Sequence, residues 1–205
     1  MPLPTPAART LKHTRRVTCE GYKRDDGLWD IEAHLIDTKT FPLKNRDRAG
    51  GEIAPEEPLH GLSIRITIDM SLNIIDAVAS MDYTPFNSCQ SISGVYKQLI
   101  GIQIAPGFTA KTKALFSGRL GCTHLLELLG PLATTAYQAT HQEREILENH
   151  WQDKGNKPPM LDTCHTLAAN GPIVKELWPH FYENTNIDKI IPTQADELPR
   201  SDANV

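Results

Sequence analysis

The sequence predicts an α+β fold, with a mainly antiparallel N-terminal sheet and helices from the C-terminal half packed on one face. Alternation of apolar and polar residues with period two, typical of half-buried strands, recurs through the first 80 positions. Helical spacing between glycine and proline stops dominates from residue 87 onward. Because the strands come first and the helices follow, the order indicates α+β rather than α/β architecture.

The clearest strand lies in the stretch RDDGLWDIEAHLIDTK, residues 24–39. Successive side chains of a strand point to opposite faces, so alternation separates an apolar face from a polar one. The apolar face carries Trp29, Ile31, Ala33 and Leu35, and the polar face carries Asp30, Glu32 and His34. We therefore expect a half-buried strand whose charged face is either open to water or one wall of a site.

A β-hairpin is predicted next along the chain. Leu62, Ile64, Ile66 and Ile68 share one face of its first run, and the turn DMSL separates this run from residues 74–79. Residues 16–22 add a strand on the N-terminal side. Segment 41–61, rich in proline, glycine and charge, is long for a connection in a compact domain, so it is either flexible or functional.

Helices fill the second half of the chain. The first is expected from an N-cap at Asn87 or Ser88 to a stop at Gly101, and a second, short helix over residues 109–118. The longest predicted helix spans residues 122–151, where Pro131 kinks or divides it. One or two short helices are expected within residues 160–184. These helices supply the layer that covers the sheet.

Length and composition fit one globular domain. The chain has 205 residues, of which 40% are hydrophobic, and we expect one core over residues 16–190 between a flexible N-terminus (1–15) and a flexible tail (191–205). A formal charge of −4 without a long basic block argues against nucleic-acid binding. No apolar run approaches the ~18–20 residues that span a bilayer, and no signal-peptide core is present, which predicts a cytoplasmic protein without a membrane partner. A homo-oligomer stays open.

The first candidate site is the polar strand face of Asp30, Glu32 and His34, because the common catalytic and nucleotide-binding motifs do not occur in the chain. Residues two apart on a strand lie roughly 6.5–7 Å apart on one side, which suits two carboxylates and an imidazole acting on one small substrate. The alternative is cross-strand charge pairing with Arg65 or Lys39 on a face exposed to water.

The second candidate is GCTHLLELL, residues 121–129, at the start of the longest predicted helix. Free backbone N–H groups and the helix dipole favour anions there, so Cys122 is either a reactive thiolate or a neighbour of a bound substrate carboxylate. His124 lies in the first turn and shares a face with Glu127. The alternative is ordinary capping by Thr123 with a buried Cys122.

Histidines make a third set. His60 precedes the hairpin with the parity of the apolar face, where it reaches the edge of a cleft or is structural. A joint metal site of His34, His60, His124 and a cysteine has residue types that suit zinc, although no short ligand spacing supports it. The presence of a metal therefore stays open.

The segments YKRDDGLWDIEAHLIDTK, HGLSIRITID, LGCTHLLELL and DTCHTLAANGPIVKELWPHFY follow one another in the chain. In this order they resemble the bacterial domain-of-unknown-function family DUF2889, and the likeness extends from about Arg16 to Tyr182. Leu62 stands where the family pattern has methionine after HG, while the charged and histidine positions are present. The resemblance implies a link to catabolism of aromatic compounds, and relatives that remove formaldehyde from lignin-derived aryl dimers.

This resemblance implies a lyase that cleaves a C–C bond by acid/base chemistry without a cofactor, acting on a small aromatic substrate. The residues that fit the reaction are His34 or His60 as base, Asp30 or Glu32 to orient it, Arg65 or Lys39 to hold a carboxylate or phenolate, and Tyr83 to flank the ring. The alternatives are a metal-assisted hydrolase or lyase, and a non-catalytic accessory protein that binds an aromatic or acyl ligand.

Overall fold

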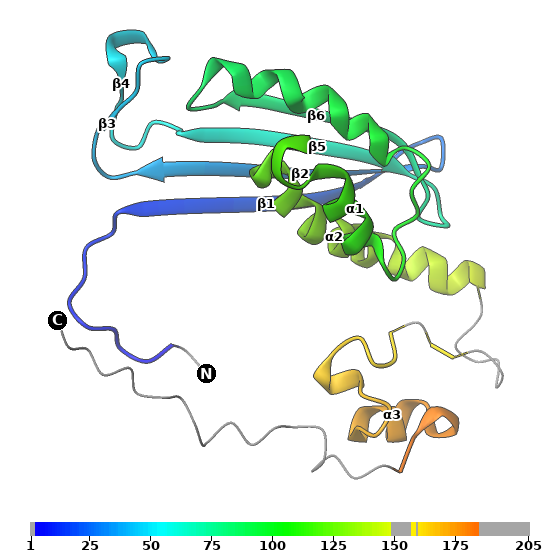
Figure 1. Ribbon diagram of the computed structural model, residues 1–205. Coiled ribbons are helices and arrows are strands. Elements are labelled where there is room, and N and C mark those ends of the chain that lie inside the picture. Colours follow the sequence, from blue (N-terminus) through cyan, green and yellow to red (C-terminus); the bar gives the residue numbers. More distant parts are fainter. Residues whose placement is uncertain (1–2, 149–156, 159, 185–205) are drawn as a thin grey trace. The chain divides into compact units, whose positions relative to one another are not determined.

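The computed structural model describes residues 3–148, 157–158 and 160–184, and Figure 1 shows the order of its elements. The main sheet has four strands in the order β1-β2-β5-β6, and each neighbouring pair is antiparallel. These strands are β1 (His13–Lys23), β2 (Trp29–Lys39), β5 (His60–Ile68) and β6 (Ile74–Tyr83). The predicted α+β class, with an antiparallel N-terminal sheet, is confirmed.

One face of the sheet, here called the covered face, carries the core. The alternating apolar side chains of β2 and β5 are buried, Ile31 and Ile66 completely, as the alternation predicts. They share one cluster with the buried leucines of α2 (Thr123–Glu148). Gly21 of β1 lets this helix come close, because a Cβ there would lie only 2.6 Å from the Cβ of Ala139. The opposite side, called the open face, carries Glu32 and His34.

The first predicted helix differs in type from the others. Residues Asn87–Leu99 form the 3-10 helix η2, which packs along β6. The hydroxyls of Ser91 and Ser93 donate to carbonyls three residues earlier, Ser88 O at 2.8 Å and Gln90 O at 2.9 Å. Such side-chain bonds compete with α-helical geometry, and runs of 3-10 helix this long are uncommon.

Shorter elements complete this part of the chain. The Pro- and Gly-rich segment holds a small hairpin of β3 (Leu43–Lys44) and β4 (Glu52–Ile53) with the 3-10 turn η1 (Ala49–Gly51). Helix α1 (Phe108–Phe116) and the 3-10 turn η3 (Gly118–Leu120) follow η2 and lead into α2. Pro131 lies inside α2, which continues through it.

The chain divides into two compact units after Arg144. The expected single domain over 16–190 stays a prediction. The second unit has its own apolar cluster, in which Leu161, Ala169 and Val174 pack against Trp178 and Phe181. It contains η4 (His165–Leu167), α3 (Pro172–Leu177) and η5 (Pro179–Phe181). The predicted tail, 191–205, lies outside the described residues. Within the described part of the chain, no helix combines the length and the apolar character that crossing a membrane requires.

Candidate functional site

A buried carboxylate lies near the end of β2. Asp37 has the parity of Ile31 and Leu35, so its side chain points to the covered face, where it is 1% exposed. The strand register places Arg15 of β1 on one side of it and His60 of β5 on the other. Because a buried charge is costly unless it is paired and hydrogen-bonded, these partners determine what Asp37 can do.

Arg15 binds both oxygens of Asp37. Its Nε donates to Oδ1 and its Nη2 donates to Oδ2, each at 2.8 Å, while Nη1 donates to Oε2 of Glu127 in α2 at 2.6 Å. A bidentate pair of this kind fixes the plane of the carboxylate. Burial alone would raise the pKa of Asp37, but the hydrogen bonds and charge of Arg15, together with His60, hold that pKa below its usual value. Asp37 is therefore ionised at neutral pH.

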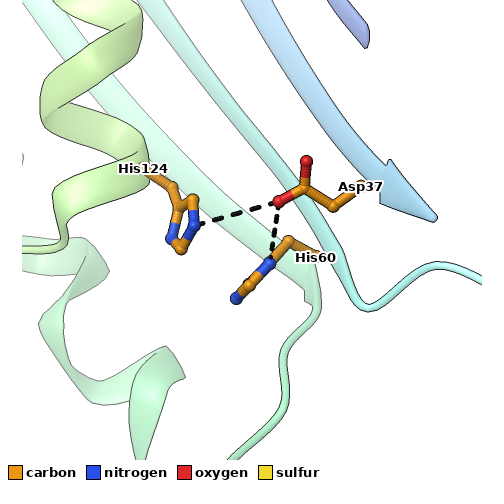
Figure 2. Close-up of side chains that lie close together, drawn as sticks. All are labelled: Asp37, His60 and His124. Carbon is orange, nitrogen blue, oxygen red and sulfur yellow. Dashed lines mark hydrogen bonds and ion pairs between the residues drawn. The ribbon is translucent and has the colours of Figure 1, made fainter. Parts of the chain in front are cut away.

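Two histidines converge on Oδ2 of this carboxylate from different elements (Figure 2), while His13 Nε2 of β1 lies 3.4 Å from Oδ1. His60 Nδ1 lies 3.0 Å from Asp37 Oδ2, and His124 Nε2 lies 3.9 Å from that oxygen. The two imidazole centroids are 3.9 Å apart, with 35° between the ring planes. An ionised carboxylate only accepts hydrogen bonds, so the proton of a neutral His60 is on Nδ1 and its Nε2 keeps a free lone pair. We call Arg15, Asp37, His60 and His124 the Asp37 cluster.

Both histidines have a pKa below that of a free imidazole, so they stay neutral down to a lower pH. Burial, followed by the charge of His124, lowers the pKa of His60 against the opposing effect of Asp37. Burial and the charge of Arg15 lower the pKa of His124, while Asp37 and Glu127 act in the opposite direction. Two neutral imidazoles beside an ionised carboxylate can accept a proton from a substrate or bind a cation.

Tyr96 of η2 holds the start of α2 in place. Its hydroxyl donates to Cys122 O and accepts from Cys122 N–H, each at 3.0 Å, and its buried ring stacks on Phe116 with centroids 4.5 Å apart. His124 follows two residues later, and its Nδ1 lies 3.9 Å from Cys122 Sγ. The predicted segment 121–129 thus places His124 in the cluster. Cys122 lies beside His124 Nδ1, whereas His124 Nε2 faces Asp37.

Other predicted site residues lie on the open face, around a hollow of about 180 Å³. Its lining includes Glu32, His34, Ser63 and Arg65. His34 Nδ1 lies 2.9 Å from Ser63 Oγ, and His34 Nε2 lies 3.5 Å from Glu32 Oε2. Arg65 Nη1 lies 3.8 Å from Glu32 Oε1. The polar strand face is therefore a cross-strand network on the side of the sheet opposite to His60 and His124.

Three further predicted residues make contacts of their own. Asp30 accepts a hydrogen bond from Thr67 Oγ1 at 2.6 Å on the open face. Lys39 Nζ lies 5.4 Å from the centre of the Phe41 ring. The ring of Tyr83, at the end of β6, lies 5.5 Å from the Arg48 guanidinium and is 44% exposed. The structure thus unites His60, His124 and Cys122, and it groups Glu32, His34 and Arg65 separately.

Asp37 and Arg15 are the members of the cluster that the sequence pattern does not single out. A signal for Asp37 exists, because it is a charged residue at a position with the parity of the apolar face, and such residues are almost never buried without a partner. Arg15 gives no comparable signal. Its role depends on the register between β1 and β2, which the sequence does not specify.

The lowered pKa values predict a loss of stability on the acid side. The unfolded chain takes up protons on His60 and His124 near pH 6.5, whereas the folded chain resists protonation until lower pH. Their contribution to the free energy of unfolding is therefore full above about pH 6.5 and is lost as the pH falls through the folded pKa values. We expect the Tm to decrease between pH 7 and pH 5.

A scan of Tm against pH checks this expectation with a matched variant. In the double variant His60→Asn, His124→Gln the two amides occupy the places of His60 Nδ1 and His124 Nε2 but do not titrate. The decrease in Tm between pH 7 and pH 5 should become shallower in this variant. An unchanged slope would show that other groups cause the acid sensitivity.

Comparison with known proteins gives one family match. A family model described as "Protein of unknown function (DUF2889)" matches residues 13–138, which include all of the Asp37 cluster. Neither the curated proteins nor the solved structures contain a match to the chain. The site itself is therefore the basis for inferring a function.

Proposed function

Because the chain belongs to the DUF2889 family, whose description names no reaction, we propose its function from the Asp37 cluster: it is an acid/base lyase with His60 as general base. The observation that supports this proposal is the 3.0 Å contact from His60 Nδ1 to Asp37 Oδ2. A carboxylate in this position fixes the tautomer and orientation of a catalytic histidine and stabilises its protonated form. Arg15 in turn keeps Asp37 ionised and in one plane.

The proposed reaction cleaves the C–C bond between a hydroxymethyl group and an aryl-bearing carbon. His60 Nε2 takes the hydroxyl proton, the C–C bond breaks, and the former alcohol carbon leaves as formaldehyde. The electron pair of the broken bond passes to the aryl-bearing carbon, where the ring delocalises it, and the imidazolium returns the proton to that carbon. Every atom of this sequence comes from the substrate and His60. The aromatic substrate class is part of the proposal and comes from what the resemblance in the sequence implies, since the family description names no substrate.

The position of His124 supports the same role. Its ring lies against His60 with 3.9 Å between centroids, so it limits the rotation of the base about its side-chain bonds. The side chains of His60 and His124 are 15% and 24% exposed, respectively, so that a substrate can approach a base that is otherwise enclosed. A general base must come within hydrogen-bond reach of the proton that it removes, and this residual exposure permits such a contact.

Formaldehyde release tests the proposal directly. Chelator-treated protein is incubated with phenolic aryl dimers that carry hydroxymethyl side chains, and formaldehyde and substrate are both quantified. The informative variant is His60→Asn, because its amide can still donate to Asp37 but has no group at the place of Nε2. We expect a reduction in rate of about 10²–10⁴-fold, the usual contribution of a general base.

His34→Ala distinguishes the two faces of the sheet in the same assay. If release is lost in this variant and persists in His60→Asn, the chemistry belongs to the open-face hollow and the proposal for the Asp37 cluster is wrong. If the wild-type protein binds the aryl dimers without releasing formaldehyde, the chain is instead an accessory binding protein.

A further inference from the structure

Three potential metal ligands from three elements meet in the Asp37 cluster. Asp37 of β2, His60 of β5 and His124 of α2 each offer one ligand atom, and these atoms all lie within 4.8 Å of one another. Figure 2 shows both imidazoles on the same side of the carboxylate, with one nitrogen of each ring directed toward it. The three residues lie far apart in the sequence, so no short metal-binding motif predicts that they form one site.

We propose that this cluster binds a divalent transition-metal ion of the zinc class through Asp37 Oδ2, His60 Nδ1 and His124 Nε2. The site is the same as that of the proposed lyase, but metal binding does not depend on the lyase activity. Two imidazoles and one carboxylate are a ligand set that zinc accepts, and three protein ligands leave a fourth position open for water or an anionic substrate.

The distances are close to those that a tetrahedral ion needs. Ligand atoms 2.0–2.1 Å from such an ion are separated from one another by roughly 3.3 Å. His60 Nδ1 is 3.0 Å from Asp37 Oδ2, within a few tenths of an ångström of this spacing, while His124 Nε2 at 3.9 Å must approach further. His124 lies in the first turn of α2, and the remaining approach is less than about 1 Å, so metal binding would require only a local adjustment of this side chain.

The neighbouring groups suit a metal-bound state. Arg15 fixes the carboxylate plane by donating to both oxygens, and the lone pair of Oδ2 that His60 now engages is the one that the ion would use. With Nε2 on the metal, a neutral His124 carries its proton on Nδ1, which points toward Cys122 Sγ at 3.9 Å. Outer contacts of this kind fix the tautomer of a histidine ligand and raise its basicity.

His60 Nδ1 cannot carry a proton and bind a metal ion at the same time. The ion displaces the Nδ1 proton to solvent and replaces the hydrogen bond to Asp37 by two coordination bonds. His60 then no longer has the carboxylate that stabilises its imidazolium form, so zinc is expected to inhibit acid/base turnover and a chelator to restore it. The cluster thus has two exclusive states, one that transfers protons and one that holds a metal.

Calorimetric titration of chelator-treated protein with Zn²⁺ tests the site without any substrate. We expect one ion per chain, and we expect affinity to fall on the order of 100-fold or more in His124→Gln and in His60→Asn, since each variant replaces one of three ligands. His180→Gln, which changes an exposed histidine of the second unit, should bind like the wild type. The absorption of a bound Co²⁺ ion should report tetrahedral geometry in the wild type.

Circular dichroism and Tm of each variant show whether it is folded, and both ligand variants must be folded for the comparison to count. Equal affinity in folded wild type and ligand variants, or no binding by the wild type, would overturn the metal site. Formaldehyde release is measured separately on the same preparations. Release by metal-free protein supports the lyase whatever the titration shows, whereas release that requires zinc supports the metal site and contradicts cofactor-free proton transfer.

Discussion

Asp37→Asn is expected to lower kcat/KM for formaldehyde release by about 10³–10⁴-fold, the scale seen when a carboxylate that orients a catalytic histidine becomes an amide. Because Arg15 donates to both carboxylate oxygens, the amide nitrogen faces one of its N–H groups in either orientation. In both orientations the variant lacks the negative charge that stabilises the protonated form of His60. Where the nitrogen takes the place of Oδ2, it also donates to His60 Nδ1, so the neutral imidazole carries its proton on Nε2 and has no lone pair for the substrate.

The folded state should survive this substitution. Asparagine has nearly the shape of aspartate, and Arg15 keeps its 2.6 Å contact with Glu127 when the charge of Asp37 is removed. Asp82→Asn is the matched control, since it makes the same change on an exposed position of β6, where Asp82 accepts from Ser80 Oγ. Kinetics and Zn²⁺ titration provide independent readouts. Activity within tenfold of wild type together with unchanged zinc affinity would remove Asp37 from both proposals.

The strand pattern predicts the sheet well because it depends on local physics. Alternation in β2 requires one apolar face and one polar face, and the structure buries Ile31 and Leu35 while leaving Glu32 and His34 partly exposed. The type of the helix after Asn87 is less predictable. The free energies of α and 3-10 geometry differ little per residue, so a glycine and several serine hydroxyls that bond to the backbone are enough to favour 3-10 geometry. The separate C-terminal unit depends on tertiary packing, which composition does not report.

The candidate site is predictable only in part, for a geometric reason. The polar face of β2 carries several titratable residues, and this concentration is why the sequence predicts a site at Asp30, Glu32 and His34. The convergent cluster lies on the other face, where a single carboxylate follows a run of apolar residues at the same parity. His60 and His124 are both identifiable as candidates from their local context. Their meeting at Asp37 depends on strand register and on the packing of α2, which only the folded chain supplies.

Tyr96→Phe is expected to destabilise the fold and also to weaken the cluster, although Tyr96 touches neither Asp37 nor a proposed substrate. Tyr96 is fully buried, and burial raises the pKa of its hydroxyl to about 12, so the group remains a neutral donor. Without that hydroxyl the Cys122 N–H loses its hydrogen bond at the start of α2, while Cys122 O keeps the N–H of Leu126 at 2.9 Å. A fully buried donor without a partner costs about 1–3 kcal/mol in the free energy of unfolding, and this N–H is only partly buried, so we expect a loss of about 1 kcal/mol.

Thermal unfolding and Zn²⁺ titration separate the two consequences. A loss of this size lowers Tm by roughly 2–4 °C per kcal/mol in a chain of this length. Because His124 follows Cys122 by two residues, a looser turn should also reduce zinc affinity by about 10–100-fold, the usual effect of removing an outer support of a ligand. Tyr22→Phe removes an exposed hydroxyl bonded to Glu20 and should change Tm little. If Tyr96→Phe lowers Tm as expected but binds zinc like the wild type, Tyr96 stabilises the core without positioning His124.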